Sequence, residues 1–294
     1  MYYPRVPLNR DALIVWPFEE RVQSYGERDS ILYGLGLGLG SDPSDASQLR
    51  FVQERDLCAV PTMAVVLGHP GNFWGDPATG INYELVLHGE QRLTLHQALP
   101  PAATVRARNR VAGIVDKGRN ALVYLERTLT DEGSGSLLAT QTTTVFCRDA
   151  GGYQGPSDAP LPAHPIPDRP RDLAIDHPTF PQQALIYRLS GDLNPLHSDP
   201  VVAARAGFPR PILHGLCTYG IAGYAILAGL CGGDPARLRR LDARFSSPAF
   251  PGEIFRTEIW HEGLGAAAYR CSVPARQVVV IDNGYCEFEV AGAA

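Results

Sequence analysis

A segment dense in proline and glycine, GGYQGPSDAPLPAHPIPDRPR at residues 151–171, divides the 294-residue chain into two parts. Neither a helix nor a strand tolerates so many of these residues in its interior, so the segment is predicted to be a linker. A chain of this length is too long for one small domain and sufficient for two of ordinary size. We therefore expect an N-terminal domain over residues 1–150, the linker, and a C-terminal domain over residues 172–294.

Each part carries three extended runs in which apolar and polar residues alternate. They comprise residues 104–118, 120–130 and 137–147 in the first part, and residues 253–263, 266–275 and 277–290 in the second. Their alternation and their enrichment in Val, Thr, Tyr and Phe predict antiparallel strands with one buried face. Residues 116–120 and 131–136 are typical of hairpin turns. The repeated set of strands indicates an internal duplication.

A helical candidate precedes each set of strands. In the second part it is Gly215–Leu230, GLCTYGIAGYAILAGL, which is apolar on every side and predicts a buried helix that ends at Gly232 and Gly233. In the first part the candidates are residues 29–39 and 56–67. A helix followed by a curved antiparallel sheet, present twice, predicts an α+β fold.

The segment 187–215, YRLSGDLNPLHSDPVVAARAGFPRPILHG, gathers the side chains that point to chemistry. It places Asp192, Asn194 and His197 within six residues, and a glycine and a proline keep its backbone off any regular path. Asp199 followed by proline is typical of a helix start, so His197 is expected just before a helix. A carboxylate and an imidazole that share one water molecule can take a proton from it and deliver a proton elsewhere.

The backbone nitrogen of Gly215 adds a third element to this pair. In the first residue of the predicted helix, the N–H has no acceptor within the helix and carries the positive end of the helix dipole. Such a donor stabilises a carbonyl oxygen that gains negative charge. Carboxylate, imidazole and this donor together favour proton chemistry next to a thioester carbonyl, namely addition or loss of water across an enoyl double bond.

The first part of the chain lacks this constellation. Residues 25–29 parallel residues 187–192, but SILYGLGLGLG follows them, without the Asn-Pro pair or the histidine. The alternating glycines do not match a nucleotide-binding pattern, and we interpret them as sites of close helix packing. We therefore expect one active site, in the second part, with the first part as a scaffold or substrate pocket.

Two strings in the second part, YRLSGDLNPLH at residues 187–197 and GFPRPILHGLCTYG at residues 207–220, are similar to a known signature. They resemble the (R)-specific enoyl-CoA hydratases, the hydratase 2 or MaoC-like family. The linker sequence PIPDRPRD and the first-part sequence HGEQRLTLHQALP resemble the two-domain members of that family. The resemblance covers nearly the whole chain and implies a double hotdog fold, in which two hotdog halves share one catalytic site.

The resemblance also implies residue roles and a reaction. Asp192 and His197 match the catalytic pair of the family, Asn194 its supporting amide, and Gly215 its oxyanion-hole donor. By analogy, the pair activates water for attack at C3 of a trans-2-enoyl thioester, a proton goes to C2, and the product is a (3R)-3-hydroxyacyl-CoA. The resemblance implies no metal or redox cofactor, and the coenzyme A is part of the acyl-CoA substrate.

Residues around the pair are candidates for binding the substrate. Tyr187 is expected to be a packed aromatic with its hydroxyl bonded near the site, and Gly191 to border the substrate. Arg205 and Arg210 are candidates for contacts with the phosphates of coenzyme A. His214 is interpreted as a histidine that bonds the backbone at the helix entrance rather than as a catalytic group.

Two other functions stay open. An acyl-CoA thioesterase of the same fold would direct water at the thioester carbonyl, although the Asn-Pro-x-His string does not favour it. A non-catalytic acyl-thioester binding protein is the other possibility, and the intact Asp192, His197 and Gly215 argue against it. The histidines at positions 69, 88 and 96 show no metal-binding spacing, so no metal is expected.

The composition restricts the partners and the compartment. A net charge of −5 and a pI near 5.9 argue against a general affinity for nucleic acid or an anionic membrane. Six cysteines without a CxxC pair are predicted to be free thiols in a reducing compartment. No signal peptide is evident, no apolar stretch reaches the ~18 residues of a membrane span, and the C-terminal AGAA is not a peroxisomal address. We expect a cytoplasmic homodimer that acts on acyl-CoA.

Overall fold

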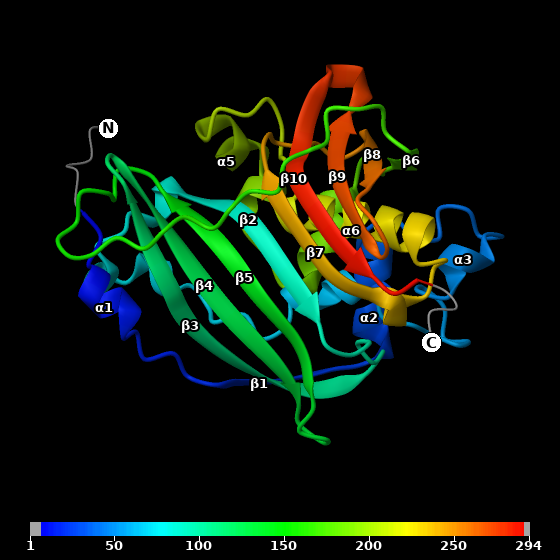
Figure 1. Cartoon of the computed structure of the whole chain (residues 1–294), viewed down its shortest axis with the longest axis horizontal. Coiled ribbons are helices and arrows are strands. Elements are labelled where there is room, and N and C mark those ends of the chain that lie inside the picture. Colours follow the sequence, from blue (N-terminus) through cyan, green and yellow to red (C-terminus); the bar gives the residue numbers. More distant parts are fainter. Residues whose placement is uncertain (1–6, 291–294) are drawn as a thin grey trace.

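The computed structural model describes residues 7–290 and contains an antiparallel sheet of ten strands (Figure 1). Residues 1–6 and the C-terminal AGAA lie outside the described residues. The strand order is β1-β3-β4-β5-β2-β7-β10-β9-β8-β6, so each half of the chain forms half of the sheet. The strands are β1 (Arg21–Tyr25), β2 (Val86–Leu95), β3 (Ala103–Lys117), β4 (Asn120–Asp131), β5 (Leu137–Cys147), β6 (Leu173–Pro178), β7 (Leu238–Phe245), β8 (Ile254–His261), β9 (Ala266–Val273) and β10 (Val278–Phe288).

The helices of the described residues are few, and most of them are short. The longest, α6, packs against β6, β7, β8 and β10 and lies behind the sheet in the view of Figure 1. Among the described residues, no helix has both the length and the apolar character needed to span a membrane. The α-helices are α1 (Arg10–Ile14), α2 (Glu27–Gly36), α3 (Ala46–Leu49), α4 (Gln183–Tyr187), α5 (Pro200–Arg205) and α6 (Gly215–Leu230).

The strongest sequence patterns are confirmed. All six predicted extended runs form strands, and both predicted hairpin turns are present. Helix α6 has the predicted bounds, and Gly232 and Gly233 follow it with positive φ. Helix α2 confirms the first of the two candidates in the first half, although it ends at Gly36.

The second helical candidate of the first half, residues 56–67, is wrong. The segment contains only a 3₁₀ turn over Pro61–Val65. Asp56 has a φ of 53°, and the proline at 61 disfavours helical backbone in the residue before it. The apolar residues of this segment are buried without forming an α-helix.

The two halves share one hydrophobic core, to which both α2 and α6 contribute. A Cβ added at Gly220 of α6 would lie 2.5 Å from the side chain of Leu37, and one at Gly223 would lie 2.6 Å from that of Thr62. One added at Gly36 of α2 would lie 3.2 Å from the Cα of Tyr187. The glycines therefore permit close packing of the helices across the boundary between the halves, which is the packing role that we expected of the first-half glycines.

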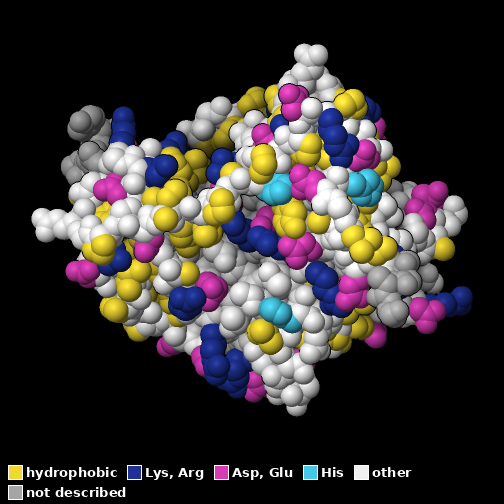
Figure 2. Space-filling model, in the orientation of Figure 1, with side chains coloured by type: hydrophobic (Ala, Val, Ile, Leu, Met, Phe, Trp, Pro, Cys, Tyr) yellow, Lys and Arg dark blue, Asp and Glu magenta, His cyan; other side chains and the backbone are white. Residues whose placement is uncertain are grey.

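The seam between the halves is the β2–β7 pair, and neither of these strands was predicted. Glu90 lies opposite Arg244 and Arg92 opposite Asp242, so facing positions carry opposite charges. The Oε1 atom of Glu90 accepts a hydrogen bond from Arg244 Nη2 at 2.7 Å. Figure 2 shows basic and acidic side chains gathered in the hollow at the middle of this outer face. The seam is thus joined by ion pairs on its outer side.

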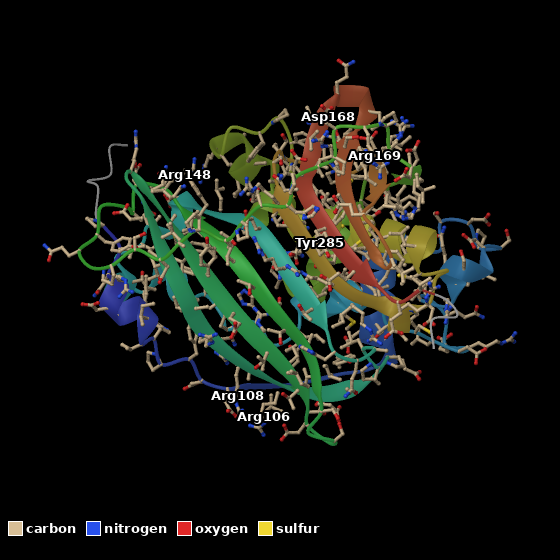
Figure 3. All side chains as sticks on the ribbon, in the orientation of Figure 1. Arg106, Arg108, Arg148, Asp168, Arg169 and Tyr285 are labelled. Carbon is tan, nitrogen blue, oxygen red and sulfur yellow. The ribbon has the colours of Figure 1, made fainter. Side chains whose placement is uncertain are left out.

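Charged side chains lie along the outer edge of the sheet in the first half. Arg106 and Arg108 of β3 point outward near β1 (Figure 3). Both pair with Glu20. Residues 151–171 form neither helix nor strand and cross the outer face of the sheet (Figure 1). Hydrogen bonds of 2.8 Å attach this segment to β2, from Arg92 to the Pro162 carbonyl, and to β10.

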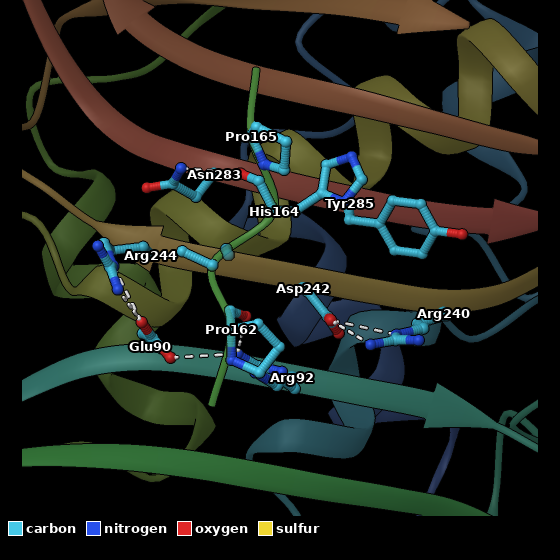
Figure 4. Close-up of a pocket in the computed structure, with 12 residues that line it drawn as sticks. Glu90, Arg92, Pro162, His164, Pro165, Arg240, Asp242, Arg244, Asn283 and Tyr285 are labelled. Carbon is cyan, nitrogen blue, oxygen red and sulfur yellow. Dashed lines mark hydrogen bonds and ion pairs between the residues drawn. The ribbon is translucent and has the colours of Figure 1, made fainter. Parts of the chain in front are cut away.

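A cavity of about 420 Å³ lies under this segment at the seam (Figure 4). It is lined by three arginines, Arg92, Arg240 and Arg244, each of which pairs with a carboxylate. Because side chains alternate along β7, the cavity lies on the opposite face of the sheet from Phe245, which packs against Gly215. We therefore assign this cavity to the joint between the halves and not to the site described next.

Candidate active site

The loop that carries Asp192 and His197 is shaped by its own side chains. Gly191 has a φ of 118°, in the region that glycine enters readily. The Oδ1 atom of Asp192 accepts from the Asn194 N–H at 3.1 Å, and the Oδ1 atom of Asn194 accepts from the Leu196 N–H at 3.0 Å. These two turns bring the side chains of Asp192 and His197 together, so the structure gives Asn194 a role in holding the loop.

The helix after this loop is built as predicted. Asp199 caps α5 by accepting a hydrogen bond from the Val201 N–H at 2.8 Å, and Pro200 is the first helical residue. Gly207 then ends the segment with positive φ. His197 therefore lies in the short 3₁₀ turn Pro195–His197, just before α5.

The side chains of Asp192 and His197 face each other across a gap. The distance between His197 Nε2 and Asp192 Oδ2 is 4.0 Å, too long for a direct hydrogen bond and suited to one bridging water. The Nδ1 atom of His197 lies 2.9 Å from the Ile212 carbonyl oxygen, which can only accept. In the neutral ring Nδ1 therefore carries the proton, and Nε2 offers its lone pair toward the gap.

Burial decides the protonation state of His197. The residue is only 8% exposed, whereas the Asp192 side chain is 50% exposed. Burial lowers the pKa of His197, while its bond to the Ile212 carbonyl and the charge of Asp192 raise the pKa by smaller amounts. The net lowering keeps the imidazole neutral at neutral pH, as a base requires.

His214 connects this pair to the start of α6. Its Nε2 atom donates a hydrogen bond to the Asp192 carbonyl oxygen at 3.1 Å, which confirms that it bonds backbone at the helix entrance. Its ring also stacks on that of His197, with centroids 3.8 Å apart. The next residue, Gly215, is the first of α6, so its N–H has no acceptor within the helix. The donor expected for an oxyanion is thus adjacent in sequence to a residue that contacts both members of the pair.

The same three side chains are the one group of the described residues that could hold a metal ion. Ligand atoms of Asp192, His197 and His214 all lie within 4.8 Å of one another. Each histidine ring uses one nitrogen for a backbone carbonyl and has the other left for a proton or an ion. Proton transfer with a water molecule and coordination of a metal ion would therefore compete for the same nitrogen and oxygen atoms.

The expected substrate-binding residues fall into two groups. Tyr187 is 1% exposed, as a packed aromatic should be, and its ring lies between those of Tyr33 and His214, whereas the hydrogen bond expected of its hydroxyl stays a prediction. Gly191 borders a cavity of about 160 Å³ whose other walls come largely from the first half, including Tyr33, Met63 and Leu67. This cavity opens beside the loop that carries Asp192.

The two arginines lie apart from this cavity. Arg205 is exposed at the end of α5, and its side chain makes no hydrogen bond or ion pair to another described residue. Arg210 donates to the Pro251 carbonyl at 3.1 Å, and its guanidinium lies 5.0 Å from the centre of the Phe250 ring. Neither arginine contacts Asp192 or His197 among the described residues.

Two histidines of the first half, His69 and His88, lie near enough to Asp192 for its charge to raise their pKa. At His88 burial outweighs that charge and lowers the pKa to about 4. His88 meets Phe245 edge-on, with ring centroids 4.8 Å apart, and Phe245 lies against Gly215. Sequence spacing excluded these histidines as metal ligands but could not place them here, because only the β2–β7 pairing brings His88 beside α6.

Two family models match the chain. The model described as MaoC like domain matches residues 162–282, and the model described as MFE-2 hydratase 2 N-terminal domain matches residues 23–149. A protein of Arabidopsis thaliana named "Enoyl-CoA hydratase 2, peroxisomal" is 42% identical over 296 residues, covering 95% of each chain. A Mycobacterium tuberculosis protein named "3-hydroxyacyl-thioester dehydratase Y" is 43% identical over 285 residues, covering 93% of this chain and 96% of the relative.

Solved structures show the same architecture. A MaoC-like dehydratase from Phytophthora capsici superposes with a TM-score of 0.88 at 33% identity, covering 97% of this chain and all of the other. A Mycobacterium tuberculosis protein described as having a double hotdog fold superposes with a TM-score of 0.56 at 14% identity, covering 92% and 96% of the two chains. The predicted α+β double hotdog fold is confirmed.

Proposed function

Because the chain belongs to the family of MaoC-like dehydratases and hydratase 2 enzymes, we propose that it is a hydro-lyase that converts trans-2-enoyl-CoA and water into (3R)-3-hydroxyacyl-CoA. The observation that carries the proposal is the 4.0 Å gap between His197 Nε2 and Asp192 Oδ2, beside the N-terminus of α6. Hydration of an enoyl thioester requires an acid/base pair that can bind one water and a donor that stabilises the thioester oxygen, and both are present here.

In the proposed mechanism, one water bridges Nε2 of His197 and Oδ2 of Asp192. The unprotonated Nε2 takes a proton from this water as its oxygen attacks C3. The electrons of the double bond move toward the thioester carbonyl, whose oxygen accepts a hydrogen bond from the Gly215 N–H. The pair then returns the proton to C2, so the hydroxyl and the hydrogen of one water are added and both side chains regain their starting states.

The cavity beside Gly191 is the proposed place for the acyl chain. It has a volume of about 160 Å³, and its lining is mixed: Met63, Val66 and Leu67 offer an apolar wall to a short hydrocarbon chain, and Gln23, Ser24 and Asp29 form a polar one. Most of its lining residues belong to the first half, so the half without the acid/base pair is proposed to bind the acyl chain. Arg205 and Arg210, both exposed near α5, are proposed to meet the phosphates of coenzyme A, and no further cofactor is proposed.

One assay tests the proposal against the two other functions. The protein is mixed with trans-2-butenoyl-CoA, and loss of the conjugated thioester absorbance is followed together with release of free thiol. Loss of absorbance without thiol, with a product of (3R) configuration on chiral analysis, is the expected result. Thiol release would instead identify a thioesterase, and binding without either change would identify an acyl-thioester binding protein. Turnover that persists after dialysis against a chelator is expected, because no step uses a metal.

We also propose that the protein acts in the cytoplasm as a homodimer. All six cysteines are free thiols, and five of them are buried, which suits a reducing compartment. The Arabidopsis relative is named peroxisomal, so imaging of a fluorescent fusion is the direct test of the compartment. Sedimentation of the purified protein tests the dimer, and a monomer at micromolar concentration would contradict it.

A further inference from the structure

His214 contacts both members of the Asp192–His197 pair. Its ring lies on the His197 ring, with centroids 3.8 Å apart and planes inclined by 26°. Its Nε2–H donates to the Asp192 carbonyl oxygen at 3.1 Å. One side chain, itself only 1% exposed, therefore touches the ring of the proposed base and the backbone of the carboxylate residue.

The His214 ring is itself held by packing that reaches the first half. The Tyr187 ring lies 5.1 Å from it, and the Tyr33 ring of α2 lies 5.8 Å from Tyr187. Tyr33 and Tyr187 are both fully buried. A row of four rings thus runs from α2 to His197, and its members are closely packed, so displacement of one ring would move the next.

Two contacts, one at its edge and one on its face, fix the direction of the His197 ring. The Ile212 carbonyl holds Nδ1 at the ring edge, and His214 covers one ring face. The edge contact alone leaves the ring free to swing about that bond, whereas the face contact restricts its plane. Together they aim Nε2 at Asp192 Oδ2 across the 4.0 Å gap.

His214 can play this part only as a neutral ring. Its Nε2 carries the proton that is donated to the Asp192 carbonyl, and its Nδ1 is buried with no hydrogen-bond partner in the described part of the chain. Burial lowers its pKa most, and a charge on His197 would lower it further. Asp192 and Arg188 are the other charged groups that act on it, the first raising and the second lowering its pKa. A neutral ring adds no charge that would oppose protonation of His197.

We propose that His214 is a positioning residue, which fixes the plane of the His197 imidazole by stacking and the backbone of Asp192 by its Nε2–H, so that both proton-handling atoms face one water. This inference rests on the proposed hydration and goes beyond a histidine that merely bonds the helix entrance. A misplacement of about 1 Å in such a pair costs on the order of 100-fold in rate.

Two substitutions separate the two contacts. His214→Phe keeps a flat ring on His197 and removes the donor to Asp192, whereas His214→Gln keeps a donor and removes the ring. Both variants are expected to lower kcat roughly 10- to 100-fold while KM changes less than about threefold, because the pair is displaced and the acyl cavity is not. Near-ultraviolet circular dichroism checks that each variant is folded.

His177 provides a matched control for the loss of a buried histidine. It is 7% exposed, and its Nε2 donates to the Leu37 carbonyl at 2.9 Å. The centroid of its ring lies 6.0 Å from that of the Tyr224 ring. It contacts neither member of the pair among the described residues. His177→Ala is therefore expected to lower the melting temperature and to keep the wild-type kcat. If the His214 variants lose activity only in step with stability, as a structural role would require, the inference is wrong.

A second readout does not depend on activity. Titration of the His197 ring protons by NMR should give a pKa below 6.5 in the wild type and in His214→Phe, and a value nearer 6.5 in His214→Gln, where the ring face is uncovered. An unchanged His197 pKa in His214→Gln would overturn the inference. If the wild type fails to hydrate enoyl-CoA while this titration shifts as expected, the proposed function fails and the positioning contact stands.

Discussion

His197 Nε2 and Asp192 Oδ2 lie 4.0 Å apart and are not hydrogen-bonded to each other. A direct bond would require a proton on Nε2, because an ionised carboxylate only accepts, and the lone pair that a base needs would then be lost. The observed separation instead lets one oxygen atom lie within bonding distance of both side chains. The two residues come from a single loop of six residues that its own Asx turns hold in place. The geometry for handling a proton is therefore local, while the walls around it come from both halves.

The pH dependence of kcat/KM should report the lowered pKa of His197. Burial favours the neutral ring, so the free enzyme keeps its base at pH values where an exposed histidine would be protonated. The acid limb of the profile should then have its midpoint below about 6.5. Initial rates at low substrate concentration from pH 4 to 8 check this, and a midpoint above 6.5 would show that the base is not a buried histidine.

The free energy of unfolding should decrease as the pH is lowered through the range in which His88 titrates. Its pKa is about 4 in the folded chain and about 6.5 when unfolded, so between these values the unfolded state binds more protons and stability decreases as pH falls. This group should remove about 2 kcal/mol between pH 7 and pH 5. In urea unfolding, His88→Gln should reduce the pH effect by that amount. A pH effect in His88→Gln as large as that of the wild type would contradict this assignment.

Arg127 should be among the most costly side chains to remove. It is 4% exposed and pairs with no carboxylate within residues 7–290, but it donates to the Asn109 side chain at 3.0 Å and to the carbonyls of Val65 and Leu67 at 3.2 and 2.8 Å. Arg127→Ala leaves three acceptors without their donor, so a loss of about 3–5 kcal/mol is expected in urea unfolding.

The neighbouring outer face supplies the control for Arg127. Arg108 of β3 is exposed and pairs with Glu20, so Arg108→Ala should cost less than about 1 kcal/mol. Similar losses for the two variants would mean that Arg127 does not hold the carbonyls of residues 65 and 67.

Gly34 of α2 should not tolerate a methyl group. A Cβ there would lie 2.7 Å from the Phe51 carbonyl oxygen and 2.9 Å from the side chain of Val52. Because a backbone atom cannot move aside cheaply, Gly34→Ala should cost about 1–3 kcal/mol, although alanine favours the helix. Gly26→Ala, where no atom lies within 4 Å, is the control. Thermal unfolding of both variants tests this, and an unchanged melting temperature in Gly34→Ala would refute the packing role.

The sequence predicted the elements whose patterns are local. Helix α6 is apolar on all sides because both halves surround it, and the loop of Asp192 and His197 carries its own turn residues. The seam could not be predicted in this way. In the sequence, the charged residues of β2 and β7 are typical of surface residues. The pairing of the two strands, which the sequence does not indicate, is what places Glu90 opposite Arg244.

The same limit applies to the site. Asp192, Asn194 and His197 are neighbours in sequence and could be grouped from it. The family resemblance added Gly215 to this group as the oxyanion-hole donor. His69 and His88 come from the other half and carry no spacing signal, so the position of His88 beside α6 follows only from the long-range pairing of the sheet. For residues 56–67 the sequence predicted burial correctly but not the backbone structure, because apolar character alone does not distinguish an α-helix from other buried backbone.

Replacement of the two members of the pair is the most direct test of the account. Asp192→Asn and His197→Gln should each lower kcat/KM for trans-2-enoyl-CoA by at least about 10³-fold, because neither amide can exchange the proton, while circular dichroism stays that of the wild type. Asp199→Asn, which preserves the cap of α5, should keep full activity. Folded variants of Asp192 and His197 that both retain near wild-type kcat/KM would contradict the assignment of the site.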